Sequence, residues 1–566
     1  MSDAAEIKVD VVVLGAGVAG MSAALFVALR GLSVLVLEKA TTVGGTSAFS
    51  AGTAWIPGSM HAAAVNPDDT RDNVEQYLRN AVGPRLDEQK LDAFLSNGPR
   101  AVLELDIQSE VRFRARPHHP DYLSDVKGST LCGRALEPLP FDGHKLGPLL
   151  PLLRPPLRPS TVAGMIVGAD DIRHLLKATR SPASFMHATN LFARYAADLL
   201  LHGRGTRLLM GNALCGRLLY SLRQRGVEIW TEVKATELLV DRAGVIGVLA
   251  QRHQKSVRVV AAKGVVLATG GFGHSERLQD MLLPSPVARQ TAIPPEVTGD
   301  GIEMGLAAGA TLTTGYSDGA FWSPVSLDRR RDGTTAVYPH FFLDRGKPGF
   351  LAVNRKGERF VNEATSYDAF VRAMYAADGT TPSIPCFLIA DERAIRKYGM
   401  GLALPGGYRL RKLVRNGYIV RGSSLADLAE SIGLETETLA RTVTRFNQHA
   451  RSGHDPDFER GAIPANLVLG DPTHSPNPCL GALEHAPFYA LKIHPGINGT
   501  GVGLVTDEHA RVLREGHEPI PGLYACGNDM TSLMAGTSPG PGITIGPAIT
   551  FANIAARHIF KGGRRA

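Results

Sequence analysis

A stretch of glycine and proline near the C-terminus has residue types that can hold negative charge close to the backbone. Residues 535–548 read Ala-Gly-Thr-Ser-Pro-Gly-Pro-Gly-Ile-Thr-Ile-Gly-Pro-Ala, which favours a tight loop over a helix or strand. Residues 549–560 then follow the period of an amphipathic helix. A loop entering a helix N-terminus presents free N–H groups and a positive dipole. A flavin that accepts electrons builds negative charge at N1 and O2, so this loop could bind a flavin. A plain surface turn is the alternative.

A second glycine motif stands near the N-terminus, where it separates a predicted strand from a predicted helix. The apolar run 9–14 leads into Gly15-Ala-Gly-Val-Ala-Gly20, a helical pattern follows over 21–30, and a second strand, 32–37, ends on Glu38. In this order the motif is typical of dinucleotide sites, with the pyrophosphate at the helix N-terminus and the acidic residue on the ribose hydroxyls. We therefore predict a nucleotide site made by Gly15, Gly17, Ala19, Gly20 and Glu38.

Length and composition bound the protein class. A chain of 566 residues with 44% hydrophobic content predicts at least two domains. No signal pattern and no apolar run near 18 residues is present, and the five cysteines form no C-x-x-C pair, so we expect a cytoplasmic protein with no membrane span, disulfide or zinc site. The net charge of +7 comes from dispersed arginines without an aromatic platform, which argues against a nucleic-acid partner.

The segment after Glu38 resembles flavoproteins of the fumarate reductase and ketosteroid dehydrogenase superfamily. Glu38-Lys39 is followed closely by Gly44-Gly45-Thr46-Ser47, which in that superfamily lines the flavin ribityl chain and ring. The resemblance implies FAD, and non-covalent FAD, because the loop lacks the histidine to which succinate dehydrogenases attach it. It also implies cofactor contacts from Lys39, Gly52, Val233, Gly270, Gly527, Asn528, Gly542, Thr544 and Ile545.

The same pattern implies an α/β architecture: a discontinuous, Rossmann-like FAD-binding domain with an inserted α+β catalytic domain. We expect residues 1–290 to form the first part of the FAD-binding domain, with a cap-like excursion at about 113–160. Residues 291–487 depart from strand–helix alternation and are assigned to the catalytic domain, with surface helices at 425–432 and 435–450. Residues 488–566 return to the FAD-binding domain.

Three departures argue against a dicarboxylate substrate. Fumarate reductases carry an arginine acid shortly after Arg-Phe-x-Asn-Glu, where this chain has Tyr367. The stretch 497–503 lacks their substrate histidine, and 535–547 contains no basic residue. Because guanidinium groups clamp carboxylates, fumarate is expected to be a poor substrate.

A tyrosine at that position resembles the 3-ketosteroid Δ1-dehydrogenases and the related cyclohexanone dehydrogenases. The resemblance makes Tyr367 the base that takes the α-proton of a ketone, with Tyr195 as a rival base or relay and Tyr338 as a third candidate. A phenol needs local stabilisation of its phenolate to act as a base at neutral pH. The Gly542 N–H is a candidate donor to the enolate oxygen.

Three further residues are candidates for the substrate pocket. Phe113 and Tyr122 could form aromatic walls, with ordinary packing as the alternative for each. Ser538 stands where the steroid enzymes place a tyrosine hydroxyl on the ketone, and serine is much shorter. Smaller cyclic ketones are therefore at least as good a fit as steroids.

The sequence thus predicts an FAD-dependent dehydrogenase that introduces an α,β double bond into a cyclic ketone, cyclohexanone-like or 3-ketosteroid. The absence of a nicotinamide site suggests that a quinone, a dye or oxygen reoxidises the flavin. An enone or fumarate-type reductase running in reverse, or a non-catalytic flavin redox sensor, are the alternatives, and convergent hydroxyl groups argue against the sensor.

Overall fold

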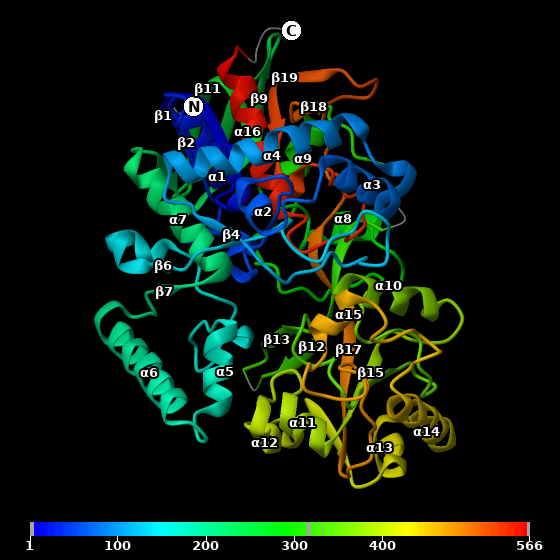
Figure 1. The fold of residues 1–566 in the computed structure, drawn as a ribbon. Coiled ribbons are helices and arrows are strands. Elements are labelled where there is room, and N and C mark those ends of the chain that lie inside the picture. Colours follow the sequence, from blue (N-terminus) through cyan, green and yellow to red (C-terminus); the bar gives the residue numbers. More distant parts are fainter. Residues whose placement is uncertain (1–4, 314–317, 331, 563–566) are drawn as a thin grey trace.

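A computed structural model describes residues 5–313, 318–330 and 332–562. It divides into an upper body that holds both termini and a lower body built from the middle of the chain (Figure 1). Within the described residues, no helix is both long and apolar enough to cross a membrane.

The upper body is organised around a buried parallel strand, β1 (Ala5–Leu14). It pairs in parallel with β2 (Val34–Leu37) on one side and β11 (Lys255–Leu267) on the other. The sheet continues through β8 (Glu228–Trp230) beyond β2, and through β19 (Pro519–Ala525) and β18 (Arg511–Leu513) beyond β11. Two antiparallel strands, β9 (Val233–Asp241) and β10 (Gly244–Arg252), extend from β11. This is the predicted Rossmann-like sheet, completed by the C-terminal segment.

Helices cover this sheet because their apolar faces need burial. The helix α1 (Val18–Ala28) packs between α7 (Met210–Gln224) and α16 (Ile545–Phe560), and α16 also contacts α4 (Glu88–Gln108). The other helices of this body are α2 (Met60–Val65), α3 (Arg71–Val82), α8 (Glu276–Leu282) and α9 (Asp300–Ala307). Two small sheets lie at the lower edge: β3 (Ala54–Trp55), β5 (Ala135–Pro138) and β4 (Phe113–Ala115), and β6 (Phe141–Asp142) with β7 (Arg207–Leu208).

The lower body is an antiparallel sheet with helices, as the predicted α+β insertion requires. Its order is β13 (Thr335–Pro339), β12 (Ala320–Arg329), β17 (Phe488–Thr500), β15 (Cys386–Asp391) and β14 (Phe350–Val353), with β16 (Ile419–Gly422) also on β17. Its helices are α10 (Tyr367–Asp378), α11 (Glu392–Tyr398), α12 (Leu410–Arg415), α13 (Leu425–Ile432), α14 (Thr436–Ser452) and α15 (Pro464–Leu469).

One predicted boundary differs from the sheet pairing. We expect residue 488 to begin the return to the FAD-binding domain, yet β17 starts at Phe488 and pairs with β12, β15 and β16 of the lower sheet. The long orange strand in the centre of Figure 1 therefore belongs to the inserted sheet, and the upper sheet resumes with β18. The apolar run that suggested the upper sheet is equally suited to a buried antiparallel strand.

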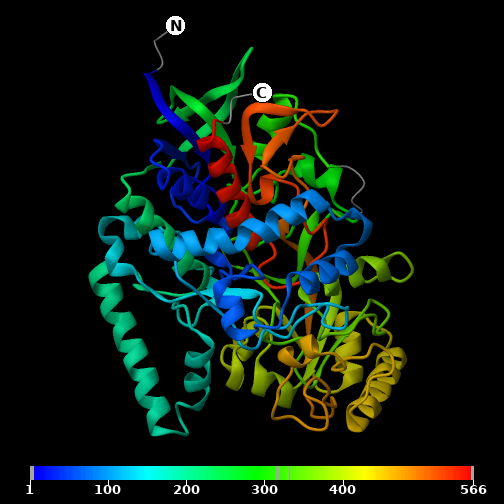
Figure 2. The ribbon, with the colours of Figure 1, turned by 45° about the horizontal axis from the view of Figure 1, so that its top comes forward.

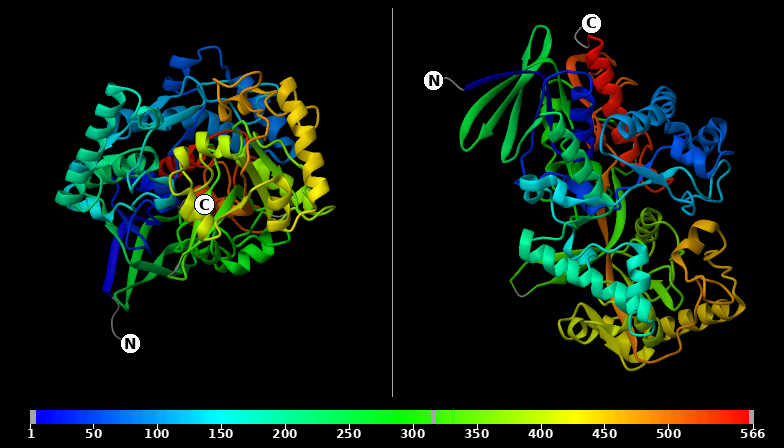
Figure 3. Two further views of the ribbon diagram at one scale, coloured as in Figure 1. Left: turned by 90° about the horizontal axis from the view of Figure 1, so that it is seen from below. Right: turned by 60° about the vertical axis from the view of Figure 1, so that its left-hand side comes forward.

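A helical hairpin projects beside the lower body. It consists of α5 (Ala169–Lys177) and α6 (Pro182–His202), which pack on each other. Figure 2 and the left-hand view of Figure 3 show both helices to one side of the inserted domain.

Candidate active site

The first glycine motif forms a turn that leaves room in front of the N-terminus of α1. A Cβ at Gly15 would lie 2.3 Å from the Ala268 carbonyl oxygen, and one at Gly20 would lie 1.9 Å from the Gly15 carbonyl oxygen. At Gly17, in contrast, a Cβ would meet nothing within 4 Å. Gly17 is the N-cap of α1 and, as a glycine, supplies no capping side chain of its own. The turn thus has the open space and unpaired helix dipole that a pyrophosphate needs.

Glu38 and the second glycine loop lie around this turn. One Glu38 carboxylate oxygen accepts the Ala16 N–H at 2.7 Å, and the Glu38 carbonyl accepts the Val233 N–H at 2.9 Å. Burial raises the pKa of Glu38. The Gly44 N–H donates to the Ala16 carbonyl at 2.8 Å, so the loop predicted to reach the flavin is anchored on the nucleotide turn.

The remaining members of this loop take different positions. The Ser47 hydroxyl accepts the Val18 N–H at 3.4 Å, next to Gly45 and Thr46 in the same short 3-10 helix. A Cβ at Gly52 would lie 2.7 Å from the Gly211 nitrogen, so Gly52 permits close packing on α7. The Lys39 ammonium is 2.6 Å from both Thr298 Oγ1 and Asp300 Oδ2, which commits it to these protein groups.

A buried aspartate that was not predicted from the sequence joins two further segments that were predicted to contact the cofactor. Asp529 accepts the Gly271 N–H at 2.8 Å and the Thr269 hydroxyl at 2.9 Å, and so holds the turn containing Gly270 against the turn of Gly527 and Asn528. A Cβ at Gly527 would lie 2.7 Å from the Ala19 Cβ, which brings this turn onto the start of α1. The signal in the sequence that could have indicated this role is the position of Asp529, directly after Gly527-Asn528 and close to the end of a strand.

The C-terminal glycine loop packs on β3 and on the excursion at 113–160. The Gly542 carbonyl accepts the Trp55 N–H at 3.0 Å, and a Cβ at Gly542 would lie 2.4 Å from the Thr53 carbonyl oxygen. The Pro539 carbonyl accepts the Tyr122 N–H at 2.8 Å and the Tyr77 hydroxyl at 2.5 Å. The loop then passes through Thr544, the N-cap, into α16, which begins at Ile545.

Tyr367 and Tyr122 form a hydroxyl pair at the meeting point of the two domains. Tyr367 is the first residue of α10, and its hydroxyl lies 3.4 Å from that of Tyr122. The two rings cross edge to face at 5.6 Å, and Phe341 lies edge to face with Tyr367 at 5.1 Å. Both tyrosines line a narrow cavity whose other walls include Phe342, Val468 and Leu469. Tyr122 therefore lines the cavity, and its hydroxyl also lies beside the hydroxyl of Tyr367.

A buried arginine lies beside this pair. The Arg345 side chain is 1% exposed and lines the same cavity. It donates to the carbonyls of His340, Phe341, Glu363 and Thr365, which leaves few of its five N–H groups for a substrate carboxylate. Burial lowers its pKa to about 10, so it stays positive at neutral pH. Burial raises the pKa of Tyr367, while the hydrogen bond from Tyr122 and the charge of Arg345 lower it.

A second arginine connects α10 to the C-terminal glycine loop. Arg372 lies on α10, pairs with Asp368 at 2.7 Å and Asp318 at 2.9 Å, and donates to the Gly536 carbonyl. The Trp322 N–H donates to Asp368 at 2.9 Å, which fixes the start of the helix on β12. This network sets the position of Tyr367 relative to the loop.

Four other predicted site residues lie elsewhere or without a defined contact. Tyr195, on α6, packs in a small apolar cluster with Met165, Val167 and Leu191, and α6 stands away from α10 (Figure 1). Tyr338 is buried on β13 against His340, and Phe113 is a core residue of β4. The structure does not bring these three to Tyr367, because Tyr338 and Phe113 are buried in the packing of their own strands and Tyr195 packs, half-buried, on its own cluster. Ser538 is half-buried directly before Pro539.

A buried serine–histidine–aspartate chain lies behind the cavity. His340 is 2.6 Å from Asp344 and 2.8 Å from the Ser326 hydroxyl, which also meets the Tyr418 hydroxyl at 2.6 Å. The arrangement resembles a hydrolase triad. Ser326 is 0% exposed, however, so no substrate reaches it. The chain instead holds the 340–345 segment that carries the aromatic wall and Arg345.

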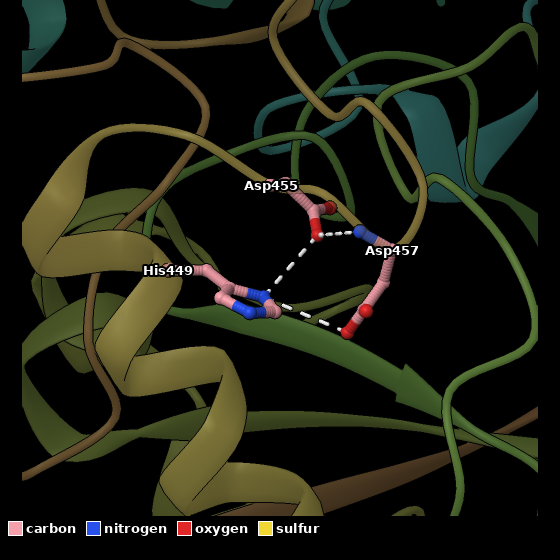
Figure 4. Close-up of side chains that lie close together, drawn as sticks. All are labelled: His449, Asp455 and Asp457. Carbon is pink, nitrogen blue, oxygen red and sulfur yellow. Dashed lines mark hydrogen bonds and ion pairs between the residues drawn. The ribbon is translucent and has the colours of Figure 1, made fainter.

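His449, Asp455 and Asp457 approach one another at the end of α14 (Figure 4). The His449 Nδ1 lies 3.4 Å from Asp455 and 3.6 Å from Asp457. Arg359 makes a two-pronged contact with Asp455, and Arg445 pairs with Asp457. Because guanidinium groups already neutralise both carboxylates, we interpret the cluster as an ion-pair network.

Comparison with known proteins agrees with this geometry. Residues 10–545 match a family described as an FAD binding domain. The chain belongs to this family of flavoproteins. It is 37% identical to the 4-oxocyclohex-2-ene-1-carboxylate 5-dehydrogenase of Sinomonas cyclohexanicum, over 98% of this chain and 94% of that protein. It is 36% identical to the 3-oxosteroid 1-dehydrogenase of Mycolicibacterium smegmatis, over 97% of each chain.

A solved structure shows the same fold. The flavoprotein superposes on a 3-ketosteroid Δ1-dehydrogenase from Sterolibacterium denitrificans, crystallised with 1,4-androstadiene-3,17-dione, with a TM-score of 0.91, 33% identity and coverage of 98% of this chain and 99% of the other. The resemblance to the ketosteroid dehydrogenase family is confirmed, as are the fold class and FAD as cofactor. This flavoprotein is an FAD-dependent oxidoreductase of the CH–CH dehydrogenase group.

Proposed function

We propose that this flavoprotein introduces a carbon–carbon double bond next to the carbonyl of a cyclic ketone, either cyclohexanone-like or a 3-ketosteroid. The observation that carries the proposal is the Tyr367–Tyr122 hydroxyl pair. The Tyr122 N–H donates to the Pro539 carbonyl, so this pair is attached to the C-terminal glycine loop. The named functions of the homologues support the same chemistry.

Tyr367 acts in this proposal as the base that takes the α-proton. Its phenolate would be stabilised by the Tyr122 hydroxyl and by the buried positive charge of Arg345, the two groups that lower the pKa of Tyr367. The Gly542 N–H is the proposed donor to the developing enolate oxygen. FAD, when bound, supplies the acceptor for the hydride that leaves the β-carbon, which completes the two-electron oxidation.

The FAD-binding residues proposed for this step are those of the two glycine loops, Glu38, and the turns at Gly270 and Gly527. We expect FAD to be non-covalent, since residues 41–57 contain no histidine. A quinone, a dye or oxygen is the proposed final electron acceptor. A cytoplasmic location is proposed because the described cysteines are all free thiols, as suits a reducing compartment.

Anaerobic reduction of the bound flavin tests the proposal. Its absorbance at about 450 nm would be followed after separate addition of cyclohexanone, a 3-ketosteroid and succinate. Bleaching by a ketone and not by succinate is expected, and the more effective ketone indicates the ring size. No bleaching by either ketone would contradict the proposal and direct attention to reduction of enones by the pre-reduced enzyme.

A further inference from the structure

A buried cluster of charged side chains lies directly behind the C-terminal glycine loop. Arg134 is 1% exposed, and its guanidinium donates to Asp69 at 2.6 and 2.7 Å and to Asp121 at 2.8 Å. It also donates to the Gly128 carbonyl at 2.8 Å and lies over the Tyr77 ring at 5.2 Å. Because removing three charged groups from water is costly, the cluster needs a role beyond filling space.

The Asp121 carboxylate of this cluster is held from three directions. The Trp55 Nε1–H donates to Oδ1 at 2.9 Å, while Arg134 and the Thr130 N–H donate to Oδ2 at 2.8 and 3.2 Å. The Asp121 N–H in turn donates to the Thr130 carbonyl at 3.0 Å. A carboxylate with three donors fixes the backbone that carries it, and Asp121 directly precedes Tyr122. The cluster therefore determines where Tyr122 begins.

The C-terminal glycine loop packs on the same carboxylate. A Cβ at Gly540 would lie 2.8 Å from Trp55 Nε1 and 3.0 Å from Asp121 Oδ1, so the loop backbone lies directly on the hydrogen bond between these two side chains. The Trp55 N–H also donates to the Gly542 carbonyl at 3.0 Å. Tyr122 and the loop are thus both attached to one buried group.

Folding stability is a poor explanation for this ion pair. Burial raises the pKa of Asp121 to about 6, although Arg134 and two hydrogen bonds lower it. At neutral pH the ionised carboxylate therefore reduces the free energy of unfolding. Buried ion pairs in general add little net stability, because the loss of hydration offsets the attraction. What the pair does supply is a single orientation, and proton transfer is sensitive to displacements of about 1 Å.

We infer that Arg134 and Asp121 are positioning residues for the proposed ketone oxidation. Through the backbone they set the Tyr122 hydroxyl beside the proposed base, and through Trp55 they set the loop that carries the Gly542 N–H. One buried ion pair thereby aligns the groups that act on the proton and on the enolate oxygen. Neither residue touches the substrate, and the inference rests on the proposed function.

The variant Asp121→Asn, in the FAD-loaded protein, tests the inference. Asparagine keeps the shape and can still accept the Trp55 N–H, but the attraction to Arg134 is lost. The variant should fold, because Asp69 still neutralises the guanidinium. With cyclohexanone or the 3-ketosteroid, whichever bleaches the wild-type flavin, kcat should fall about 10–100-fold with a smaller change in KM. Trp55→Phe removes another donor to Asp121 without changing a charge and should act in the same direction.

A double-mutant cycle separates positioning from a merely structural role. If Asp121 acts through the Tyr122 hydroxyl, Asp121→Asn should lower kcat much less in a Tyr122→Phe background than in the wild type. The rising limb of kcat/KM against pH should also move to higher pH, because a displaced Tyr122 no longer lowers the pKa of Tyr367. Asp171→Asn is the matched control and should keep the wild-type kcat, since Asp171 is a buried aspartate of α5 that pairs with Arg207 at 2.8 Å.

A wild-type kcat and an unmoved pH limb in Asp121→Asn would overturn the inference. Equal losses of kcat with and without the Tyr122 hydroxyl would also overturn it and assign the cluster to stability. Ultraviolet titration of tyrosinate, with the corresponding Tyr367→Phe protein subtracted, needs no turnover and should show a higher pKa for Tyr367 in Asp121→Asn. If that shift is seen but no ketone bleaches the wild type, the proposed function fails while the positioning of Tyr122 holds. Bleaching without the shift contradicts the positioning alone.

Discussion

At the scale of single residues, the pair of tyrosine hydroxyls is the feature on which the proposed proton abstraction depends. Tyr367 and Tyr122 are 245 residues apart in the chain and 3.4 Å apart in the fold. Neither phenol would be a base alone, because burial raises the pKa of both. Arg345 is the fixed positive charge that works against this effect.

Removing the Tyr367 hydroxyl tests the base directly. Tyr367→Phe is expected to lower kcat for ketone oxidation by about 10²–10⁴-fold, since the proton acceptor is lost while the ring still packs on Phe341. FAD content should stay unchanged. Tyr338→Phe is the matched control and should keep most of the activity, because Tyr338 lies on β13 in the core. Wild-type turnover by Tyr367→Phe would refute the assignment.

The pH profile tests the roles of Tyr122 and Arg345. The hydrogen bond from Tyr122 and the charge of Arg345 lower the pKa of Tyr367. Loss of either group therefore raises that pKa, so less phenolate is present at a given pH. The rising limb of kcat/KM against pH should move to higher pH in Tyr122→Phe and in Arg345→Met. A limb that stays in place in both variants would show that another group titrates.

At the scale of elements, the first turn of α1 and the network at the start of α10 decide whether cofactor and base meet. Gly17 and Gly20 belong to one motif but have opposite surroundings. A Cβ at Gly17 would enter open space, whereas a Cβ at Gly20 would meet the Gly15 carbonyl oxygen. Arg372 ties α10 to Gly536, so the helix that begins with Tyr367 cannot shift without moving the loop.

A pair of alanine variants separates the two glycine roles. Gly17→Ala should fold with the stability of the wild-type apoprotein yet lose FAD affinity, because the new methyl group enters the space left for the pyrophosphate. Gly20→Ala should unfold at a lower temperature even without FAD, since its Cβ meets the Gly15 carbonyl oxygen at 1.9 Å. Flavin content and thermal unfolding of the apoproteins measure the two effects. Full FAD retention by Gly17→Ala would contradict the assignment.

Loss of Arg372 tests the coupling of α10 to the loop. Arg372→Met is expected to lower kcat by about 10–100-fold with a smaller change in KM, because a misplaced base costs rate more than binding. Arg396→Met on α11 is the control, since Arg396 is exposed and pairs only with Glu392 among the described ion pairs. If KM rises while kcat holds, Arg372 shapes the binding of substrate instead.

At the scale of the whole molecule, buried carboxylates respond to acid in opposite directions, and both directions occur in each domain. In the inserted domain, His340 and two backbone N–H groups hold the pKa of Asp344 at about 2, and arginines lower the pKa of Glu363 and Asp455. In the FAD-binding domain, burial raises the pKa of Asp121 to about 6 and that of Asp529 as well.

Acid should therefore remove the stability that ionised Asp344 gives the inserted domain. A depressed pKa gives stability that is present above the unfolded value, near pH 4, and is lost as the pH falls toward the folded value. Asp344 alone accounts for about 2 kcal/mol between roughly pH 4 and 2. The raised pKa of Asp121 acts oppositely between about pH 6 and 4.

Thermal unfolding at pH 6, 5, 4 and 3 measures this effect, with probes in each domain. Asp344→Asn should be less stable than wild type at neutral pH and should lose less on acidification. A variant as acid-sensitive as the wild type would show that Asp344 does not contribute.

The sequence by itself determined what depends on short segments. The turn from Gly15 to Gly20, the strand end at Glu38 and the loop at Gly44 follow from local backbone geometry, and their spacing suffices to predict an FAD site. Tyr367 could be predicted as the base because it follows the Arg-Phe-x-Asn-Glu motif at 359–363. The surface helix predicted at 425–432 matches α13, since helical periodicity is local.

Only the tertiary structure decided which distant segments meet. It chose Tyr122 over Tyr195 and Tyr338 as the partner of Tyr367, because a helical or strand pattern does not tell which domain an element packs against. It placed β17 in the inserted sheet, since pairing partners of an apolar strand are set by long-range contacts. It likewise showed which residues of α6 are buried, Ser184, Ala188, Leu191 and Asp198, because periodicity gives the faces of a helix but not which one is buried.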